Sequence, residues 1–304
     1  NRLWALPQAI ESCRATKAEH EIIVVDDGGT DGTFEWLAKQ PDVIAVRTDN
    51  WGKDWAVNKA FAMARGQYVR FLDSDDWLEP EANDAQLEIG MREDADIVVA
   101  GYRTVDDRTN ESVLAPWNPS DDFIAQQMGD SQSGHYSAFL FKRSFIGDVP
   151  HRPEFLANDD RMFILEASLK HPKLAVWDKL ALVHRHHDRG RLQAPRPAEE
   201  APMHLAEVKI YRKVMTLLAA RGELTERRRR APAAKLWQIA HQIARYDVEE
   251  AAELARWVRE LDPDFQVPGT GLLPATYRAL DFRTAARLLN LRRRLLRPLR
   301  ALAR

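Results

Sequence analysis

The chain of 304 residues contains a single cysteine, Cys13. One thiol excludes an internal disulfide, and such cysteine usage is typical of a reducing compartment, so we expect a cytoplasmic protein. No apolar run approaches the roughly 18 residues that a membrane-spanning helix needs. No signal peptide is visible, and because the sequence opens abruptly we expect the native start to lie outside it. With 45% hydrophobic and 30% charged residues, the composition excludes collagen and wholesale disorder.

The last 22 residues contain no aspartate, glutamate or lysine, while they hold eight arginines and seven leucines. The remaining 282 residues therefore carry 36 basic and 46 acidic side chains, a formal net charge of −10. The leucine spacing in this tail predicts a basic amphipathic helix, interrupted at Pro298. Such a helix fits peripheral contact with the inner face of an anionic membrane, or packing on the helical region or on a second subunit as in a homodimer. The acidic body argues against nucleic acid as a partner.

The first half of the chain alternates short apolar runs with helical patterns. Apolar runs that stop at polar turns are typical of buried strands. Strands that alternate with helices predict an α/β fold with a mostly parallel, Rossmann-like sheet flanked by helices. We expect strands at 22–25, 43–46, 68–72 and 96–102, and helices at 33–39, 56–65 and 80–91.

The second half is predicted to become mainly helical. Before the helical part begins, we expect a strand at 138–142, a helix at 159–170, and two short strands at 174–177 and 180–184. After a Pro- and charge-rich linker or lid at 188–202, helices are expected at 203–221, 233–245, 249–261 and from about 277. We therefore predict two domains, an α/β domain over residues 1–190 and a helical domain over residues 191–304.

Three carboxylates follow the third predicted strand, in the sequence Asp73-Ser74-Asp75-Asp76. Carboxylates this close repel one another, and a divalent cation between them relieves the repulsion. Hard oxygen ligands suit Mg²⁺ or Mn²⁺, which keep coordination positions open for phosphate oxygens. The alternative is a solvated turn before the helix that begins near Pro80.

A second acidic cluster, Asp26-Asp27-Gly28-Gly29-Thr30-Asp31-Gly32, follows the first predicted strand. Its glycines allow the backbone to approach a ligand closely, and its carboxylates can accept hydrogen bonds from a base or a ribose hydroxyl. A helix-capping turn is the alternative. Because ligands of α/β sheets bind beyond the carboxyl ends of the strands, we expect the two clusters to converge on one ligand.

Several strings, in this order, resemble the nucleotide-binding half of the inverting family-2 glycosyltransferases with the GT-A fold. They are NRLWALPQAIESC (1–13), IIVVDDGGTDGT (22–33), NWGKDWAVNKAFAMARGQYVRFLDSDD (50–76) and LEPEA (78–82). In that family a strand precedes the position of Asn1, so this chain is expected to lack the first strand. The resemblance covers about the first hundred residues and fades after Tyr102.

The resemblance implies a function for the whole chain. A family-2 enzyme transfers a sugar from a nucleoside-diphosphate sugar, with UDP favoured, to a hydroxyl of a glycan or lipid-linked acceptor. Mn²⁺ or Mg²⁺ is the implied cofactor, and cell-surface glycan or polysaccharide synthesis is the implied setting. The resemblance implies that Asp26 or Asp27 contacts the base of the nucleotide and that Asp75 ligates the metal. The other nucleotide-sugar contacts that the resemblance implies are Lys53, Asn58, Asp73 (at the ribose) and Ser74.

The string NDDRMFILEA (158–167) resembles the segment that carries the family's catalytic base. By this match Asp160 takes the position of the base and Asp159 that of the preceding acidic residue. The family often has Glu where Asp159 stands and an aromatic residue where Arg161 stands. Asp160 would accept a proton from the acceptor hydroxyl during a single inverting displacement. Because a helix N-terminus favours anions, the alternative is that both carboxylates only complement this helix.

The sequence His184-Arg185-His186-His187 follows the last predicted strand. Family members often carry Arg-x-His here, which fits Arg185 and His187. A neutral histidine can ligate a metal or contact the diphosphate, so we predict His187 at the metal site. An exposed polar strand end is the alternative. His135 and Trp117 lie in the region after Tyr102, where the resemblance fades. From this position alone we expect them to line the acceptor site.

Two other functions fit parts of these patterns. A sugar-phosphate nucleotidyltransferase shares the sheet architecture and a metal-binding carboxylate, but it needs a Gly-rich loop with Arg and Lys after the first strand. A catalytically inactive GT-A-like scaffold would act through its helical region and would need neither Asp75 nor Asp160.

Overall fold

The structure, a computed structural model, describes residues 1–189 and 197–301. Contacts between residues divide the chain into two compact units. Residues 122–131 belong to the unit of C-terminal helices, although the sequence surrounds them with α/β elements. The predicted domain boundary at 190/191 lies outside the described residues, as do residues 190–196 of the predicted linker at 188–202. The part of that linker from Pro197 onward is helical.

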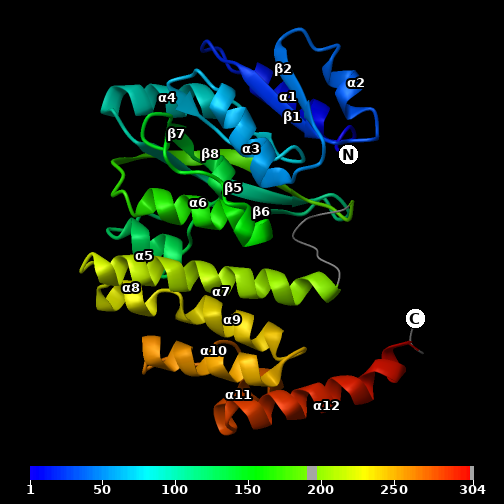
Figure 1. Cartoon of the computed structure of the whole chain (residues 1–304), viewed down its shortest axis with the longest axis vertical. Helices are drawn as coiled ribbons and strands as arrows, with labels where there is room; N and C mark the ends of the chain where they lie inside the picture. Colours follow the sequence, from blue (N-terminus) through cyan, green and yellow to red (C-terminus); the bar gives the residue numbers. More distant parts are fainter. Residues whose placement is uncertain (190–196, 302–304) are drawn as a thin grey trace. The chain divides into compact units, whose positions relative to one another are not determined.

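The first unit contains the strands and the helices that flank them (Figure 1). In chain order its elements, with η for short 3₁₀ helices, are α1 (Leu6–Arg14), β1 (Ile22–Asp27), α2 (Thr33–Leu37), β2 (Val43–Thr48), α3 (Lys53–Met63), β3 (Tyr68–Val69), β4 (Trp77–Leu78), α4 (Ala82–Glu93), β5 (Ile97–Asp106), β6 (Ser112–Ala115), η1 (Tyr136–Ala138), β7 (Leu140–Lys142), η2 (Pro153–Asn158), α6 (Asp159–Ser168) and β8 (Leu174–His186).

The strands form two sheets. β1 and β2 pair in parallel. The larger sheet has the order β3-β7-β5-β8-β4, with β6 paired to β5. In it β5 and β8 run parallel, whereas the other pairs of described strands are antiparallel. Figure 1 shows α3 and α4 on one side of β5 and β8 and α6 on the other. The predicted α/β class is therefore confirmed, with a mixed rather than a mostly parallel sheet.

The two short strands predicted between residues 174 and 184 are one continuous strand, β8. Its pairing with β5 shifts register on both sides of Gly101, with Asp178 and Lys179 extra on one side and Ala181 on the other. The break predicted between the two short strands falls at Asp178 and Lys179. A Cβ on Gly101 would lie 2.8 Å from Cα of Pro116, so glycine permits the close approach of the chains at this bulge.

The strand predicted at 68–72 ends at Val69, and the next residues enter the site as irregular chain. Arg70 holds this segment in place. Its guanidinium donates to the carbonyl of Ser137 at 2.8 Å and to Asn83 Oδ1 at 2.9 Å, and it also bonds Gln86. Because Arg70 is anchored to α4 and to η1, the acidic cluster that begins three residues later has a defined position.

The second unit consists of helices. Its elements are α5 (Phe123–Met128), α7 (Pro197–Ala220), α8 (Glu226–Arg230), α9 (Ala233–Ile243), α10 (Val248–Leu261), α11 (Leu272–Ala279) and α12 (Phe282–Ala301). Trp237 of α9 lies at the centre of an aromatic cluster with Phe265, Tyr277 and Phe282. Helix α12 continues through position 298, where an interruption was predicted. Among the described residues, no helix is long and apolar enough to cross a membrane.

Candidate active site

Both acidic clusters open on one cavity of the first unit, with a volume of about 1490 Å³. Asp26 and Asp27 end β1, and Asp73–Asp75 lie between β3 and β4. The expected convergence of the two strand ends is therefore present in the structure. The polar residues of the predicted site that line this cavity are Asp26, Asp27, Lys53, Asp73, Ser74, Asp75, Asp159 and Asp160.

The Asp27 carboxylate holds the turn that precedes α3. Its Oδ1 accepts the backbone N–H of Trp51 at 2.7 Å and the hydroxyl of Thr48 at 2.8 Å. Its Oδ2 accepts the backbone N–H of Gly52 at 2.7 Å. Because α3 begins at the next residue, Asp27 determines where Lys53 enters the cavity.

Asp26 is 5% exposed and is less engaged than its neighbour. Its Oδ2 accepts no hydrogen bond from the described part of the chain, and Nε of Arg47 lies 3.8 Å away. A Cβ on Gly29 would lie 2.4 Å from Oδ1 of Asp26. Glycine at position 29 therefore makes room for this carboxylate at the cavity wall.

Lys53 provides the positive charge at the centre of the cavity. Its Nζ lies 2.9 Å from Oδ1 of Asp73. Burial by itself raises the pKa of Asp73, but the charge of Lys53 lowers this pKa to about 2. Burial alone would lower the pKa of Lys53, whereas Asp73, Asp159 and Asp160 together raise it above its ordinary value. Lys53 therefore stays protonated and balances three carboxylates.

Asp75 and His187 are brought together as predicted. Oδ2 of Asp75 lies 2.9 Å from Nε2 of His187 and 3.8 Å from Nε of Arg2. Nδ1 of His187 accepts the backbone N–H of Arg189 at 2.9 Å. The neutral ring therefore carries its hydrogen on Nε2 and donates it to Asp75. The ring of Trp4 packs against His187 with the centroids 4.7 Å apart.

A divalent cation fits at Asp75. The carboxylate is a hard oxygen ligand, its side chain is 18% exposed, and it faces a cavity where phosphate oxygens and water can complete the coordination. His187 could ligate the same ion only through an unprotonated Nε2, and the N–H of Arg189 favours the opposite tautomer. In this arrangement His187 orients the Asp75 carboxylate through a hydrogen bond.

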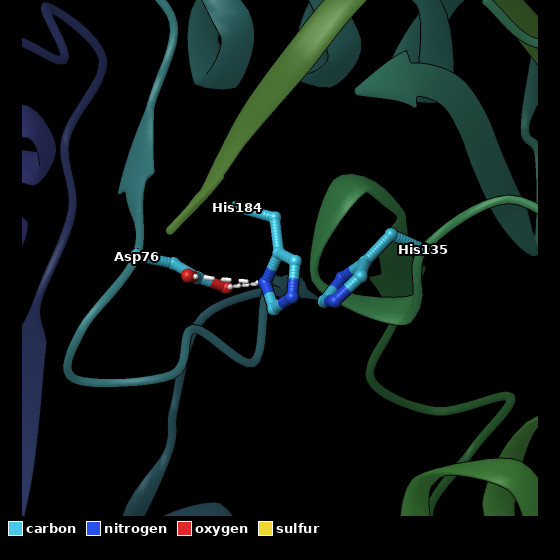
Figure 2. A group of neighbouring side chains, drawn as sticks. All are labelled: Asp76, His135 and His184. Carbon is cyan, nitrogen blue, oxygen red and sulfur yellow. Dashed lines mark hydrogen bonds and ion pairs between the residues drawn. The ribbon is translucent and has the colours of Figure 1, made fainter. Parts of the chain in front are cut away.

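A second group of metal-ligating side chains, drawn in Figure 2, lies next to this site. Asp76, which is 1% exposed, accepts hydrogen bonds from Nδ1 of His184 at 3.0 Å and from the N–H of Arg185 at 2.9 Å. The ring of His135 lies against that of His184, and one ligand atom from each of the three residues lies within 4.8 Å of the others. Burial lowers the pKa of His135 to about 4, and its Nδ1 accepts the N–H of Ser137. We interpret these contacts as a hydrogen-bonded tie between the acidic turn and the end of β8.

Asp159 and Asp160 occupy the first turn of α6 and differ in environment. Asp159 is 1% exposed, and its Oδ2 accepts a hydrogen bond from Nδ1 of His151 at 2.8 Å. Burial by itself raises the pKa of Asp159, but His151 and Lys53 lower it. Oδ1 of Asp160 accepts the N–H of Arg161 at 2.7 Å. Burial raises the pKa of Asp160, with Lys53 acting in the opposite direction. The pKa values of these two neighbouring carboxylates are therefore shifted in opposite directions.

Asn58 and His187 of the predicted site, and Arg185 of the predicted Arg-x-His motif, do not belong to the cavity lining. The amide of Asn58 bonds the backbone of His151 in both directions, donating from Nδ2 at 2.7 Å and accepting at Oδ1 at 2.9 Å. Arg185 stacks on the rings of Trp77 and Trp4, at 4.7 Å and 5.4 Å from their centroids. Asn58 thus joins α3 to the chain before η2, and Arg185 braces the end of β8.

Sequence reasoning missed Asp54 and His151. Asp54 lies in the first turn of α3 and is 9% exposed. Burial, followed by the charge of Asp159, raises the pKa of Asp54 to about 7. An acidic residue on the inner face of a helix that starts at the cavity is the signal that could have found Asp54. No local pattern marks His151, because its partners are distant in sequence or lie across a loop.

Comparison with known proteins identifies the family. Residues 1–148 match the sequence model described as Glycosyl transferase family 2. The chain is 29% identical over 181 residues to the poly(ribitol-phosphate) beta-glucosyltransferase of Bacillus spizizenii. That match covers 56% of this chain and 28% of the relative. The chain spans less than half the length of the curated relatives that it matches first.

Two solved structures share the fold. TarS 1–349 of S. aureus, in complex with UDP-GlcNAc, has a TM-score of 0.65 at 15% identity, covering 97% of this chain and 89% of TarS. The mannosyltransferase PcManGT from Pyrobaculum calidifontis, in complex with GDP-Man and Mn²⁺, has a TM-score of 0.50 at 16% identity, covering 94% of this chain and 83% of PcManGT. At such identities the likeness shows the fold alone, and that fold is the predicted GT-A fold. With two acidic clusters on one cavity and a matching family model, residues 1–148 belong to glycosyl transferase family 2.

Proposed function

We propose that the protein is a metal-dependent, inverting glycosyltransferase that uses a nucleoside-diphosphate sugar, with UDP as the favoured nucleotide. The acceptor is a hydroxyl of a glycan or lipid-linked molecule in cell-surface glycan or polysaccharide synthesis. The observation that carries this proposal is the convergence of both acidic clusters, Lys53 and Asp160 on one cavity. The sugar nucleotides bound by TarS and PcManGT support the donor class. The poly(ribitol-phosphate) in the name of one relative supports a polymeric acceptor.

The donor would bind across the two strand ends. Asp26 and Asp27 would face the base, and Asp73 would face the ribose. Nζ of Lys53 lies 2.9 Å from Oδ1 of Asp73. When the donor is bound, the positive charge of Lys53 would offset the negative charge of the diphosphate. Ser74 lines the cavity between the ribose and metal positions.

Asp75 would hold Mn²⁺ or Mg²⁺, with His187 at 2.9 Å orienting its carboxylate. When bound, the ion supplies positive charge that stabilises the departing nucleoside diphosphate. The Mn²⁺ in the complex of PcManGT supports this cofactor class. Before donor binding, the charge of Arg2, whose Nε lies 3.8 Å from Asp75, offsets that of the carboxylate, and His187 donates a hydrogen bond to it.

Asp160 would act as the base. It takes the proton of the acceptor hydroxyl as that oxygen attacks the anomeric carbon. The new carbon–oxygen bond forms while the bond to the diphosphate oxygen breaks, so the nucleoside diphosphate leaves with the electron pair. One displacement inverts the anomeric configuration. Burial raises the pKa of Asp160, which makes it a stronger proton acceptor than an ordinary aspartate.

Calorimetric titration with UDP, GDP and dTDP, each with and without Mn²⁺, tests this function. We expect metal-dependent binding of one of the three, loss of the metal dependence in Asp75→Ala, and donor binding without transfer in Asp160→Asn. NMR of the product would show the inverted anomer. Asp178→Asn, an exposed carboxylate in the bulge of β8, is the matched control. Normal transfer by Asp160→Asn would contradict the assignment of the base, and absence of nucleotide binding would support an inactive scaffold.

We also propose that α12 contacts an anionic membrane surface, which would place the protein at the inner membrane face. One side of α12 packs inside the helical unit, where Ala285 and Leu289 are 0% and 6% exposed. On the other side Leu288, Leu291 and Leu295 are 51%, 54% and 65% exposed. The tail contains no acidic residue, so a homodimer through this face would bring arginines together, whereas anionic lipids neutralise them.

Co-sedimentation with vesicles tests this contact. We expect the protein to bind phosphatidylcholine vesicles that contain phosphatidylglycerol, but not phosphatidylcholine alone, and to lose binding when Leu288, Leu291 and Leu295 are changed to serine. Serine at Val113 and Leu114, which are equally exposed on β6, is the control. If the three-leucine variant still binds, α12 is not the contact. If light scattering instead shows that the unmodified protein is a dimer and the three-leucine variant a monomer, the second-subunit alternative is correct.

A further inference from the structure

A chain of buried polar side chains runs behind the wall that carries Asp160. The hydroxyl of Tyr136 lies 3.0 Å from Nε2 of His151, and Nδ1 of His151 lies 2.8 Å from Oδ2 of Asp159. The carboxyl groups of Asp159 and Asp54 lie close enough to share a hydrogen bond, and Oδ1 of Asp54 is buried with no partner among the described residues. Tyr136, His151, Asp159 and Asp54 are 8%, 2%, 1% and 9% exposed, so water does not separate them.

The hydrogens of this chain can be assigned from the donors and acceptors. Two carboxyl groups can share a hydrogen bond only when one of them is protonated. Burial and the charge of Asp159 raise the pKa of Asp54 to about 7, whereas that of Asp159 is lowered, so the proton resides on Asp54. His151 donates from Nδ1 to Asp159 and accepts at Nε2 from the hydroxyl of Tyr136, whose pKa burial raises well above its ordinary value. Asp159 is therefore the one ionised group, with donors on two sides.

These hydrogen-bonded side chains join the helices beside the cavity. Asp159 lies in the first turn of α6, and Asp54 lies in the first turn of α3. The backbone of His151 is also bonded to the side chain of Asn58, which is one helical turn further along α3. The start of α6 is thus fixed to α3 through both Asp54 and His151. The residue that follows Asp159 in this fixed turn is Asp160.

We propose that Asp54, as a neutral carboxylic acid, and His151 are positioning residues for the base Asp160. This inference rests on the proposed function, in which Asp160 takes the proton of the acceptor. The two residues touch neither donor nor acceptor in this role. They hold Asp159 from opposite sides and so set the direction in which the adjacent Asp160 enters the cavity.

The proposal predicts a pH dependence with a defined sign. The groups that face Asp54 are Lys53 on its own helix, Asp159 on α6 and Tyr136 of η1, whereas His151 acts through Asp159. Above pH 7 Asp54 loses its proton, the hydrogen bond to Asp159 is replaced by repulsion, and the turn that carries Asp160 is displaced. For a single ionisation, kcat falls about tenfold for each further pH unit. In Asp54→Asn the amide still donates to Asp159 and cannot ionise, so this alkaline fall disappears.

The experiment measures kcat and KM of the full chain between pH 6 and pH 9. We expect kcat of the unmodified protein to fall above pH 7, and kcat of Asp54→Asn to exceed it at pH 9. The control Asp178→Asn should follow the unmodified protein. His151→Asn, which keeps a donor near the position of Nδ1, should retain more kcat than His151→Leu, with KM for the donor unchanged in both. The same alkaline fall in Asp54→Asn would overturn the proposal, as would equal kcat of the two His151 variants.

A second measurement separates this proposal from the proposed function. In ¹³C carboxyl NMR of aspartate-labelled protein, the resonance that is missing from Asp54→Asn should titrate near pH 7. This readout requires neither donor nor acceptor. If it titrates near pH 7 but no sugar is transferred, the proposed function fails while the protonated pair stands. If it titrates near pH 4, Asp54 is ionised at neutral pH and the positioning role is wrong.

Discussion

Replacing Lys53 by methionine tests the electrostatic balance of the cavity, because methionine keeps the length of the side chain and removes its charge. The pKa of Asp73 is lowered from 3.8 to about 2 beside Lys53. A difference of this size corresponds to about 2 kcal/mol of stability at pH 7. Without Lys53, burial raises the pKa of Asp73, and only the smaller effects of His135 and His184 oppose it. We therefore expect Lys53→Met to lower the free energy of unfolding by at least about 2 kcal/mol at pH 7.

The sign of the pH dependence follows from the same pKa. Because the pKa of Asp73 is lower in the folded state than in the unfolded chain, its stabilisation is complete above pH 4 and is lost as the pH falls through 2. At pH 3 about half should remain, which is about 1 kcal/mol. Urea unfolding at pH 7 and pH 3 measures both values. Lys59→Met, an exposed lysine of the same helix, should change neither. An equal loss at the two pH values would refute the reasoning, since the pair would then not act through the ionisation of Asp73.

Three further predictions concern the walls of the cavity. Gly29→Ala places a Cβ 2.4 Å from Oδ1 of Asp26 and should lower the free energy of unfolding by about 1–3 kcal/mol, whereas Gly147→Ala, with its nearest contact at 3.6 Å, should be neutral in the same urea titration. Asn58→Ala removes both hydrogen bonds to the backbone of His151 and should cost about 1–3 kcal/mol in thermal unfolding; a loss below about 0.5 kcal/mol would show that water replaces them. Chelation with EDTA should weaken calorimetric binding of the preferred nucleotide at least tenfold, with recovery on addition of Mn²⁺, and unchanged affinity would contradict the metal role of the acidic turn.

The positions of the acidic clusters could be predicted from the sequence because each follows an apolar run that stops abruptly. The run at 22–25 is a strand, and Asp26 and Asp27 at its carboxyl end line the cavity as expected. The run before Asp73 is a strand only at Tyr68 and Val69, so Asp73 also lines the cavity but is carried there by irregular chain. The first turn of α6 could be predicted for a similar reason, since a pair of carboxylates precedes a run of apolar residues at helical spacing.

Other features depend on contacts that no local pattern contains. The bulge at Asp178 and Lys179 is set by the partner strand β5, whereas the sequence alone predicted a break between two strands there. Asp54 looks like any acidic residue at a helix start, and only burial against α6 gives it its proton. His151 reaches the site because a loop returns it to α3. The tautomer of His187, which argues against direct ligation, depends on a backbone N–H two residues further on.

The carboxylate of Asp27 has a consequence for changing which nucleotide the protein accepts. Because both of its oxygens bind the backbone of residues 51 and 52, a substitution there reaches beyond the base pocket. It would release the start of α3 and, with it, Lys53 and Asp54. In the proposed function, nucleotide choice and proton transfer would then be linked through Asp27. Redesign of donor preference should leave Asp27 in place and vary Asp26 or Arg47 instead.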